Sequence, residues 1–249
     1  GVAALAAELR ARCVGQHLGW VFVGPPGVGK GTYASRVAQM LQIPHIAAGD
    51  LVRDEIKRGT ALGKQMKEIT EGGNLLPDDT ITRIVRSRLE RGVADGEKGF
   101  LLDGFPRRIG QAEALSEFAK VQQVVNLSLR EDVLVEKCCG RRVCSECGKS
   151  FNIADINFPA ENGKPEIVMP PLPPPAGCEG KLTTRADDTP AVVLERLRVY
   201  KEESMPVEGW YRERGLLSDF EITSGISETL PPLLQFLLNL VPDQPSSKM

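Results

Sequence analysis

The segment Trp20-Val-Phe-Val-Gly-Pro-Pro-Gly-Val-Gly-Lys-Gly-Thr32 decides the fold of this chain. It begins with a short apolar run that contains β-branched residues, passes through glycines in the pattern G-x4-G-K, and continues into the helical periodicity of residues 31–42. Glycines in this context let backbone N–H groups turn toward phosphates, and the start of the helix adds its positive dipole end. Lys30 supplies a mobile positive charge. The segment therefore predicts a phosphate-binding loop between a strand and a helix.

Strands and helices are expected to alternate along the rest of the chain. Short apolar runs at residues 100–102 and 124–127 have the length and composition of buried parallel strands. This alternation predicts an α/β fold with a P-loop nucleoside triphosphate hydrolase-like core, in which helices cover both faces of a parallel sheet. Helical patterns are expected at residues 51–58, 62–71, 78–91, 109–119, 133–137 and onward, 190–203, 206–214 and 230–240, with a last strand at 217–222.

Composition and charge exclude several classes of protein. The 249 residues are 41% hydrophobic and 26% charged, as is usual for globular proteins, and the formal charge of −2 gives no general basic field for nucleic acid. The most apolar stretch, residues 230–241, is shorter than the roughly 20 residues that span a bilayer and contains Pro231 and Pro232. We expect a soluble monomer whose partners include neither nucleic acid nor a membrane.

The composition changes between residues 141 and 185, which indicates an insertion. This stretch contains a C-x-x-C pair and the proline run at residues 170–175. We expect a core of residues 20–140 and 186–249, an inserted lid at 141–185 and an N-terminal extension at 1–19. The chain starts with Gly1 rather than Met, which fits a removed presequence.

The end of the phosphate loop differs from the general motif, because Gly31 follows Lys30 and the hydroxyl arrives one position later, at Thr32. This sequence, GPPGVGKGT, resembles the loop of adenylate kinases, and the resemblance extends from Trp20 to the last helix. It implies transfer of a phosphoryl group from ATP to AMP with Mg²⁺ as the cofactor. The residues that would bind ATP in the loop are Gly27, Val28, Gly29, Lys30, Gly31 and Thr32.

The AMP site of the family resembles two segments of this chain. Ile46-Ala-Ala-Gly-Asp-Leu-Val-Arg53 is similar to the family's ISTGDMLR, so Arg53 would bind the AMP phosphate, and Ala48 replaces a threonine of the base pocket. Gly73-Asn74-Leu75-Leu76 is similar to GKLV, so Asn74, Leu75 and Leu76 would line the adenine pocket.

A third segment, Asp103-Gly104-Phe-Pro-Arg107 followed by Gln111, resembles the family's DGFPR…Q and follows a predicted strand. Ligands bind at the carboxyl ends of strands in open α/β sheets. The resemblance implies that Arg107 binds the AMP phosphate, that Gly104 and Gln111 contact AMP, and that Asp103 holds magnesium through water.

The insertion resembles the lid of long-form adenylate kinases, including those of plant organelles. The resemblance implies that Arg141, Arg185 and Arg196 converge on the transferred phosphoryl group, with Arg141 also on ATP and the other two also on AMP. Phosphoryl transfer needs positioning and positive charge rather than a nucleophile of the protein. Lys137 stands where the family often has an arginine that stacks on the ATP base. We expect the lid and an AMP-binding segment at about residues 49–73 to close over the nucleotides.

Three cysteines of the insertion resemble part of the zinc knuckle found in many long lids. Cys144, Cys147 and Cys178 match three ligand positions, and Pro175 occupies the remaining one. Structural zinc prefers four ligands. We therefore favour a degenerate knuckle without zinc, in a reducing compartment.

Two alternatives stay open at this point. Ala48 and Lys137 alter contacts to the bases and leave the phosphate contacts intact. A GTP:AMP kinase or another nucleoside monophosphate kinase is therefore the first alternative. A non-catalytic nucleotide-binding protein is a distant second. A GTPase is disfavoured because no N-K-x-D motif is present. The resemblance to plant organellar enzymes favours a plastid or a mitochondrion, with the cytoplasm as the alternative.

Overall fold

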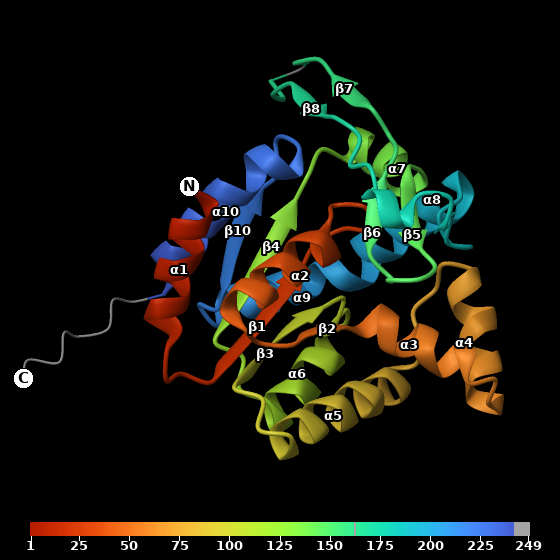
Figure 1. Ribbon diagram of the computed structural model, residues 1–249. Helices are drawn as coiled ribbons and strands as arrows, with labels where there is room; N and C mark the ends of the chain where they lie inside the picture. Colours follow the sequence, from red (N-terminus) through yellow and green to blue (C-terminus); the bar gives the residue numbers. More distant parts are fainter. Residues whose placement is uncertain (162, 242–249) are drawn as a thin grey trace, which may run out of the picture.

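A five-stranded parallel sheet forms the centre of the protein (Figure 1). The computed structural model describes residues 1–161 and 163–241. The strand order is β10-β4-β1-β3-β2, and every pairing within this sheet is parallel. The predicted α/β class with a parallel sheet is confirmed. The strands are β1 (Leu18–Val23), β2 (His45–Ala47), β3 (Gly99–Asp103), β4 (Gln123–Ser128) and β10 (Leu217–Glu221).

Helices cover both faces of the sheet because alternate residues of each strand point to opposite sides. In β1, Trp20 and Phe22 pack into one hydrophobic cluster, whereas Val21 and Val23 pack into the other. The first cluster contains residues of α1 (Val2–Cys13), α2 (Lys30–Leu41), α7 (Glu131–Cys139) and α10 (Ile226–Leu240). The second contains residues of α5 (Asp78–Ala94), α6 (Ile109–Phe118) and α9 (Met205–Glu213).

Several helices and strands were not predicted from the sequence, or begin at other residues than expected. The segment expected only as an N-terminal extension forms α1, which lies along α10 with Leu9 fully buried (Figure 1). Strand β2 has only 3 residues, too few to show a period. The expected start of α10 at residue 230 was wrong: the helix begins at Ile226 and continues through Pro231 and Pro232, because its apolar face packs on the core. The helix expected at 190–203 is α8 (Pro190–Val199) followed by a π-helical turn (Tyr200–Ser204).

The expected AMP-binding segment consists of α3 (Ala48–Lys57) and α4 (Ala61–Glu71), which pack against each other. The Thr60 hydroxyl caps α4 by accepting a hydrogen bond from the N–H of Gly63 at 2.9 Å. Helix α3 has no such cap, because the residue before it is Ala47. The backbone N–H groups of its first turn therefore have no side-chain acceptor from the N-cap residue.

The insertion contains two small sheets. Strands β5 (Arg141–Cys144), β6 (Ser150–Asn152) and β9 (Leu182–Thr183) form one, and the hairpin β7 (Ile156–Phe158) with β8 (Ile167–Met169) forms the other. A single 3₁₀ turn (Ala176–Cys178) lies between β8 and β9. Within the described part of the chain, the helices are too short or too polar to cross a membrane.

Candidate functional site

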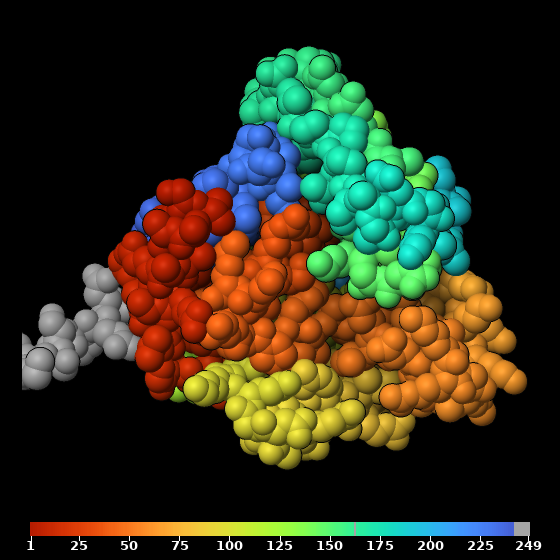
Figure 2. Space-filling model, in the orientation of Figure 1, coloured from red at the N-terminus to blue at the C-terminus, as the bar shows by residue number. Residues whose placement is uncertain are grey.

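A cleft of about 1290 Å³ opens between the phosphate loop, the α3–α4 segment and the insertion. Figure 2 shows the insertion, in green and teal, standing over the orange residues of α2, α3 and α4. Asp103, at the carboxyl end of β3, and the loop that follows β1 reach this cleft, which is where ligands bind in open α/β sheets. Of the residues predicted to bind nucleotide, Val28 alone does not line the cleft: its side chain is fully buried beneath the loop.

The phosphate loop keeps its shape through glycines. Gly24, Gly27 and Gly29 have φ values of 130°, 87° and 106°, in the region that side chains disfavour. A Cβ on Gly27 would lie 2.7 Å from the carbonyl oxygen of Leu134 and 2.9 Å from Sγ of Cys138. The loop therefore curves around the start of α2 with its backbone packed directly on α7.

The ammonium of Lys30 bonds to the loop itself. Its Nζ donates to the carbonyl oxygens of Gly24 at 2.7 Å and Pro25 at 2.8 Å. Burial lowers the pKa of Lys30 to about 8, with the charge of Asp103 opposing and those of Arg107 and Arg196 adding to the decrease. A bound polyanion would reverse this balance.

Asp103 ends β3 beside Lys30, with His45 of β2 as a second neighbour. His45 Nε2 lies 3.5 Å from Asp103 Oδ2 and is buried without a well-formed hydrogen bond. Burial acts to raise the pKa of Asp103, but His45 and the charges of Lys30 and Arg107 outweigh it, so the net pKa is lowered. Asp103 is thus held as a carboxylate at the cleft. No role for His45 could be predicted from the sequence, because a single histidine in an unrecognised strand carries no pattern.

Arg107 and Gln111 form a connected pair at the start of α6. The backbone N–H of Arg107 donates to Oε1 of Gln111 at 2.7 Å, and the guanidinium donates to the carbonyl oxygen of Gly104 at 2.9 Å. Gln111 Nε2 donates to Asp78 at 2.8 Å, which leaves one amide hydrogen for a ligand. Burial and the charge of Arg196 lower the pKa of Arg107 to about 10.

The α3–α4 segment contributes the other residues expected at AMP. Arg53 pairs with Asp50 within α3, and Ala48 is the first residue of that helix, 3% exposed. Asn74, Leu75 and Leu76 follow α4 and line the cleft.

Two adjacent carboxylates hold two of the predicted arginines. Nε of Arg141 donates to Oδ2 of Asp188 at 2.8 Å, and Arg196 pairs with Asp187 at 2.7 Å and approaches Asp188 at 3.6 Å. Burial acts to lower the pKa of Arg141, yet its hydrogen bond and charge pairing with Asp188 give a net raised value. No role for Asp187 or Asp188 could be predicted from the sequence, because their partners Arg141 and Arg196 belong to other elements.

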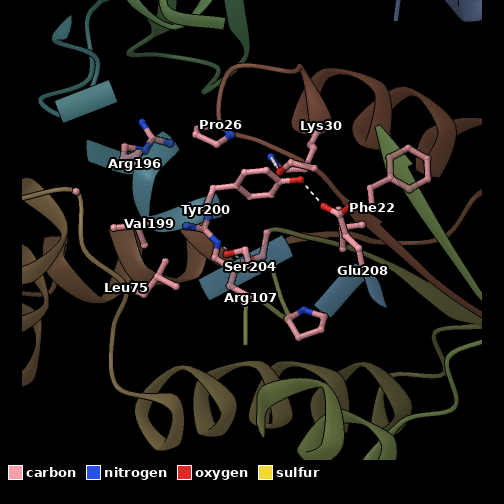
Figure 3. Close-up of a pocket in the computed structure, with 15 residues that line it drawn as sticks. Phe22, Pro26, Lys30, Leu75, Arg107, Arg196, Val199, Tyr200, Ser204 and Glu208 are labelled. Carbon is pink, nitrogen blue, oxygen red and sulfur yellow. Dashed lines mark hydrogen bonds between the residues drawn. The ribbon is translucent and has the colours of Figure 1, made fainter. Parts of the chain in front are cut away.

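Arg185 is the predicted arginine with the least compensation. Burial, then the charges of Arg141 and Arg53, lower its pKa to about 10. The lowered pKa of Arg185 shows that positive charge is concentrated on this side of the cleft, which suits the binding of an anion. Figure 3 shows Lys30, Arg107 and Arg196 among the residues that line an inner pocket. The volume of this pocket is about 60 Å³. In it, the hydroxyl of Tyr200 donates a hydrogen bond to the carboxylate of Glu208.

Lys137 does not extend over an open base pocket. Its Nζ donates to the carbonyl oxygen of Val28 at 3.1 Å, and burial lowers its pKa to about 8. The lysine therefore stabilises the phosphate loop in this conformation. Stacking on a base would require it to leave this contact.

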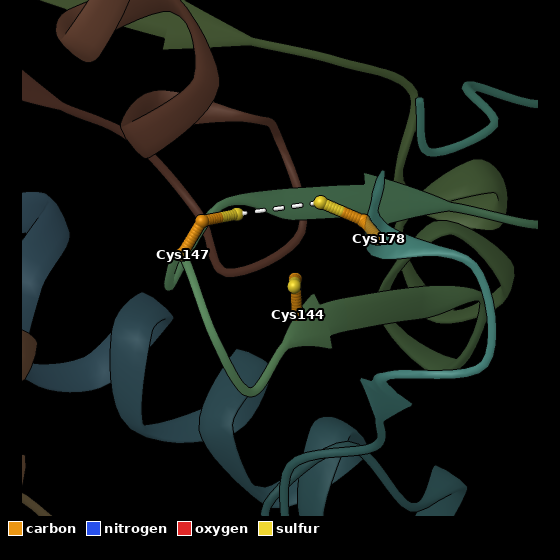
Figure 4. Close-up of side chains that lie close together, drawn as sticks. All are labelled: Cys144, Cys147 and Cys178. Atoms are coloured by element: carbon orange, nitrogen blue, oxygen red, sulfur yellow. Dashed lines mark hydrogen bonds between the residues drawn. The ribbon is translucent and has the colours of Figure 1, made fainter. Parts of the chain in front are cut away.

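The three cysteines of the insertion lie together (Figure 4). The sulfur atoms of Cys147 and Cys178 are 3.5 Å apart, and all three ligand atoms lie within 4.8 Å of one another. Pro175 precedes the 3₁₀ turn that carries Cys178 and offers no ligand atom. Among the described residues, the group has no fourth histidine, cysteine or carboxylate.

Comparisons with known proteins point to one family. The family model described as adenylate kinase matches residues 22–216. Probable adenylate kinase 1, chloroplastic, of Oryza sativa subsp. japonica is 52% identical over 99% of this chain and 84% of its own length. The adenylate kinase of Solanum tuberosum is 56% identical over 88% and 76%, and that of Moorella thermoacetica is 42% identical over 83% and 91%. With a family match across most of the chain, this protein belongs to the adenylate kinase family.

Proposed function

We propose that this protein is an adenylate kinase, which transfers the terminal phosphoryl group of magnesium-bound ATP to AMP in a reversible reaction that yields two molecules of ADP. One observation carries the proposal: a single cleft joins the phosphate loop to arginines from the core, the α3–α4 segment and the insertion. These cationic residues are Lys30, Arg53, Arg107, Arg141, Arg185 and Arg196. A protein that only binds ATP has no need for cationic residues beyond those that contact the ATP phosphates.

The arginines supply what phosphoryl transfer requires. The transition state spreads charge over equatorial oxygens, and the attacking and leaving oxygens lie roughly in line. Arg53 and Arg107 would bind the AMP phosphate, while Arg141, Arg185 and Arg196 would stabilise the transferred group. No carboxylate needs to act as a base, because positioning and charge account for the chemistry.

Asp103 and Thr32 fit a magnesium site. Mg²⁺ prefers oxygen ligands and keeps several of its waters, and both residues present oxygens to the cleft beside the loop. Asp103 stays ionised through its neighbours, as a magnesium ligand must. When bound, the ion would neutralise charge on the ATP phosphates, and Asp103 would hold it through water.

The test is a coupled assay of ADP formation from AMP with ATP, GTP or CTP as the phosphoryl donor, measured beside Lys30→Met. We expect ADP with ATP and Mg²⁺, and a loss of activity in the variant of at least about 100-fold, because a cation that stabilises transferred charge is removed. Absence of ADP from every donor would rule out the enzyme. Full activity of Lys30→Met would rule out the assigned mechanism.

We also propose that the protein acts as a monomer in a plastid. The location is supported by the name of the rice relative, which places that protein in the chloroplast. Fractionation of native tissue, with detection of this protein in purified plastids and mitochondria, would test the location. Sedimentation of the purified protein would measure its mass in solution and so test whether it is a monomer.

A further inference from the structure

Gln111 brings a buried side-chain amide to the wall of the cleft. The residue lies in the first turn of α6 and is only 2% exposed. Ala48 and Leu76, two of the residues expected at the base of AMP, line the same cleft. A buried amide needs partners for its polar atoms, and the places of its oxygen and nitrogen decide which ligand it can bind.

Two partners of opposite kinds hold this amide in one orientation. The backbone N–H of Arg107 can only donate, and it donates to Oε1 of Gln111 at 2.7 Å. The carboxylate of Asp78 can only accept, and its Oδ1 accepts from Nε2 of Gln111 at 2.8 Å. An amide turned by half a rotation would place nitrogen against the N–H and oxygen against the carboxylate. Both contacts would then be repulsive, so the two partners exclude the reversed amide.

The carboxylate of Asp78 is itself held by Arg108. Nη1 of Arg108 donates to the same Oδ1 at 3.0 Å and to the carbonyl oxygen of Leu76 at 3.2 Å. On its other side the guanidinium donates through Nε to Glu203, in the π-helical turn after α8. A guanidinium bound on both sides fixes the place of the carboxylate that accepts from Gln111.

Asp78 and Arg108 stand outside the cleft wall that Gln111 forms. Gln111 is among the residues that line the cleft, whereas Asp78 and Arg108 are not. Asp78 is one of two acidic residues in the first turn of α5, and the other, Asp79, is exposed. An effect of Asp78 on a bound nucleotide would therefore pass through the amide of Gln111.

The orientation of the amide decides which purine it fits. Toward a ligand, Nε2 of Gln111 keeps one N–H and Oε1 keeps one lone pair. Adenine matches this pair, because its 6-amino group donates and a neighbouring ring nitrogen accepts. A 6-oxo purine presents an oxygen in place of the amino group, so that oxygen would face Oε1. The reversed amide would suit the 6-oxo purine instead.

We propose that Asp78 is a positioning residue for the acceptor nucleotide. By holding the amide of Gln111 in one orientation, Asp78 makes the acceptor site select a nucleoside monophosphate with a 6-amino purine over one with a 6-oxo purine. This inference rests on the proposed function, since it concerns the base of the phosphoryl acceptor. It assigns a part of that selection to a residue that lies outside the cleft lining.

The test compares AMP with IMP, which has an oxo group in place of the 6-amino group, as acceptors in steady-state assays with ATP as the donor. Asp78→Ala removes the acceptor of the amide, and Asp78→Ser also removes it but keeps a polar residue at the start of α5. Asp78→Asn keeps an oxygen acceptor without the charge. The matched control is Asp79→Ala, which removes the neighbouring acidic residue from the same helical turn.

We expect Asp78→Ala and Asp78→Ser to raise KM for AMP by about 3- to 10-fold and to lower the AMP:IMP ratio of kcat/KM by about 10-fold, because the amide of Gln111 can then adopt either orientation. Asp78→Asn should keep this ratio within about 3-fold of wild type. KM for ATP should stay unchanged in these variants, and Asp79→Ala should behave as wild type. A merely structural role of Asp78 would leave the AMP:IMP ratio unchanged.

A double-mutant cycle shows whether Asp78 acts through Gln111. In a Gln111→Ala background, the further change Asp78→Ala should leave the AMP:IMP ratio as it is, because no amide remains to be oriented. Thermal unfolding of every variant shows whether the fold is kept.

Four results would overturn the inference. These are equal use of AMP and IMP by the wild type, an unchanged ratio in Asp78→Ala and Asp78→Ser, an equal loss in Asp78→Asn and Asp78→Ala, and the same loss without Gln111. Failure of the wild type to form ADP from AMP with any donor would instead overturn the proposed function, and this inference with it.

Discussion

The carboxylate of Asp188 is the buried acceptor for Arg141, although 47 residues separate them in the chain. Asp188 is 3% exposed and joins the first strand of the insertion to the residues that follow its last strand. The pair closes the base of the insertion and fixes the direction of an arginine that faces the cleft.

Replacement of this carboxylate should impair turnover more than binding. In Asp188→Asn the amide cannot neutralise Arg141, so the guanidinium loses its fixed orientation. We expect kcat to fall by about 10- to 100-fold, as for loss of a positioned charge in the transition state, while KM for AMP changes little. Steady-state kinetics measure both constants. Glu195→Gln, at an exposed pair on α8, is the control and should keep wild-type kcat.

ATP binding should take up protons above pH 8. The pKa of Lys30 is about 8 in the free protein, so this lysine is mostly neutral at pH 9, and adjacent phosphates would restore its charge. Bound protein then holds more protons than free protein, so affinity for ATP should decrease as pH rises from about 8 toward 10. Calorimetry at pH 9 in two buffers of different ionisation enthalpy measures the uptake. Equal heats in both buffers would contradict this assignment, and Lys30→Met should show a smaller uptake.

A hydroxyl at position 48 should improve AMP binding. Ala48 lies at the uncapped start of α3 and lines the cleft, where the family often has threonine. We expect Ala48→Thr to lower KM for AMP by about 2- to 10-fold, the effect of one hydrogen bond, and to leave KM for ATP unchanged. Initial rates over an AMP series provide the measurement. A rise in KM for AMP would show that this pocket has no room for the larger side chain.

The cysteine group should fold without zinc. Cys144, Cys147 and Cys178 offer three sulfur ligands, and Pro175 supplies none. We expect less than about 0.2 zinc per chain by elemental analysis and a melting temperature that EDTA does not change, because structural zinc prefers four ligands. One zinc per chain that survives dialysis would show that three thiolates suffice here.

Helix α1 should contribute to stability and not to catalysis. Leu9 is fully buried in the hydrophobic cluster that also contains α10, and no residue of α1 lines the cleft. We expect Leu9→Ala to lower the free energy of unfolding by about 2–4 kcal/mol, as for other buried leucines, with kcat unchanged at temperatures where it stays folded. Urea unfolding measures this loss. The exposed neighbour Arg10 gives the control, since Arg10→Ala should cost little.

The sequence predicted the parts of this protein that rest on local chemistry. The phosphate loop could be recognised because G-x4-G-K requires glycines where the backbone has positive φ, as it has at Gly27 and Gly29. The arginines followed from the family resemblance and do line one cleft. The boundaries of the core, the insertion and the N-terminal extension stay predictions.

Features that depend on distant partners could not be predicted. The pairing of Asp188 with Arg141, the contact of Lys137 with Val28 and the position of His45 beside Asp103 all join different elements. Helix α1 has weak amphipathic character, so its burial against α10 became visible only in three dimensions. A pattern along the chain cannot report such contacts.

The segment Val168-Met-Pro-Pro-Leu-Pro173 of the insertion is attached at both ends, which limits how far the insertion can move from the core. Between its bridge to Ser224 and its bonds to Asn152, the chain advances 4 residues, from Val168 to Leu172. A fully extended chain of this length covers roughly 14 Å. While both attachments hold, Asn152 of β6 cannot lie farther from Ser224 than this length plus the spacings of the two bridges, so a wider opening must first break one of them.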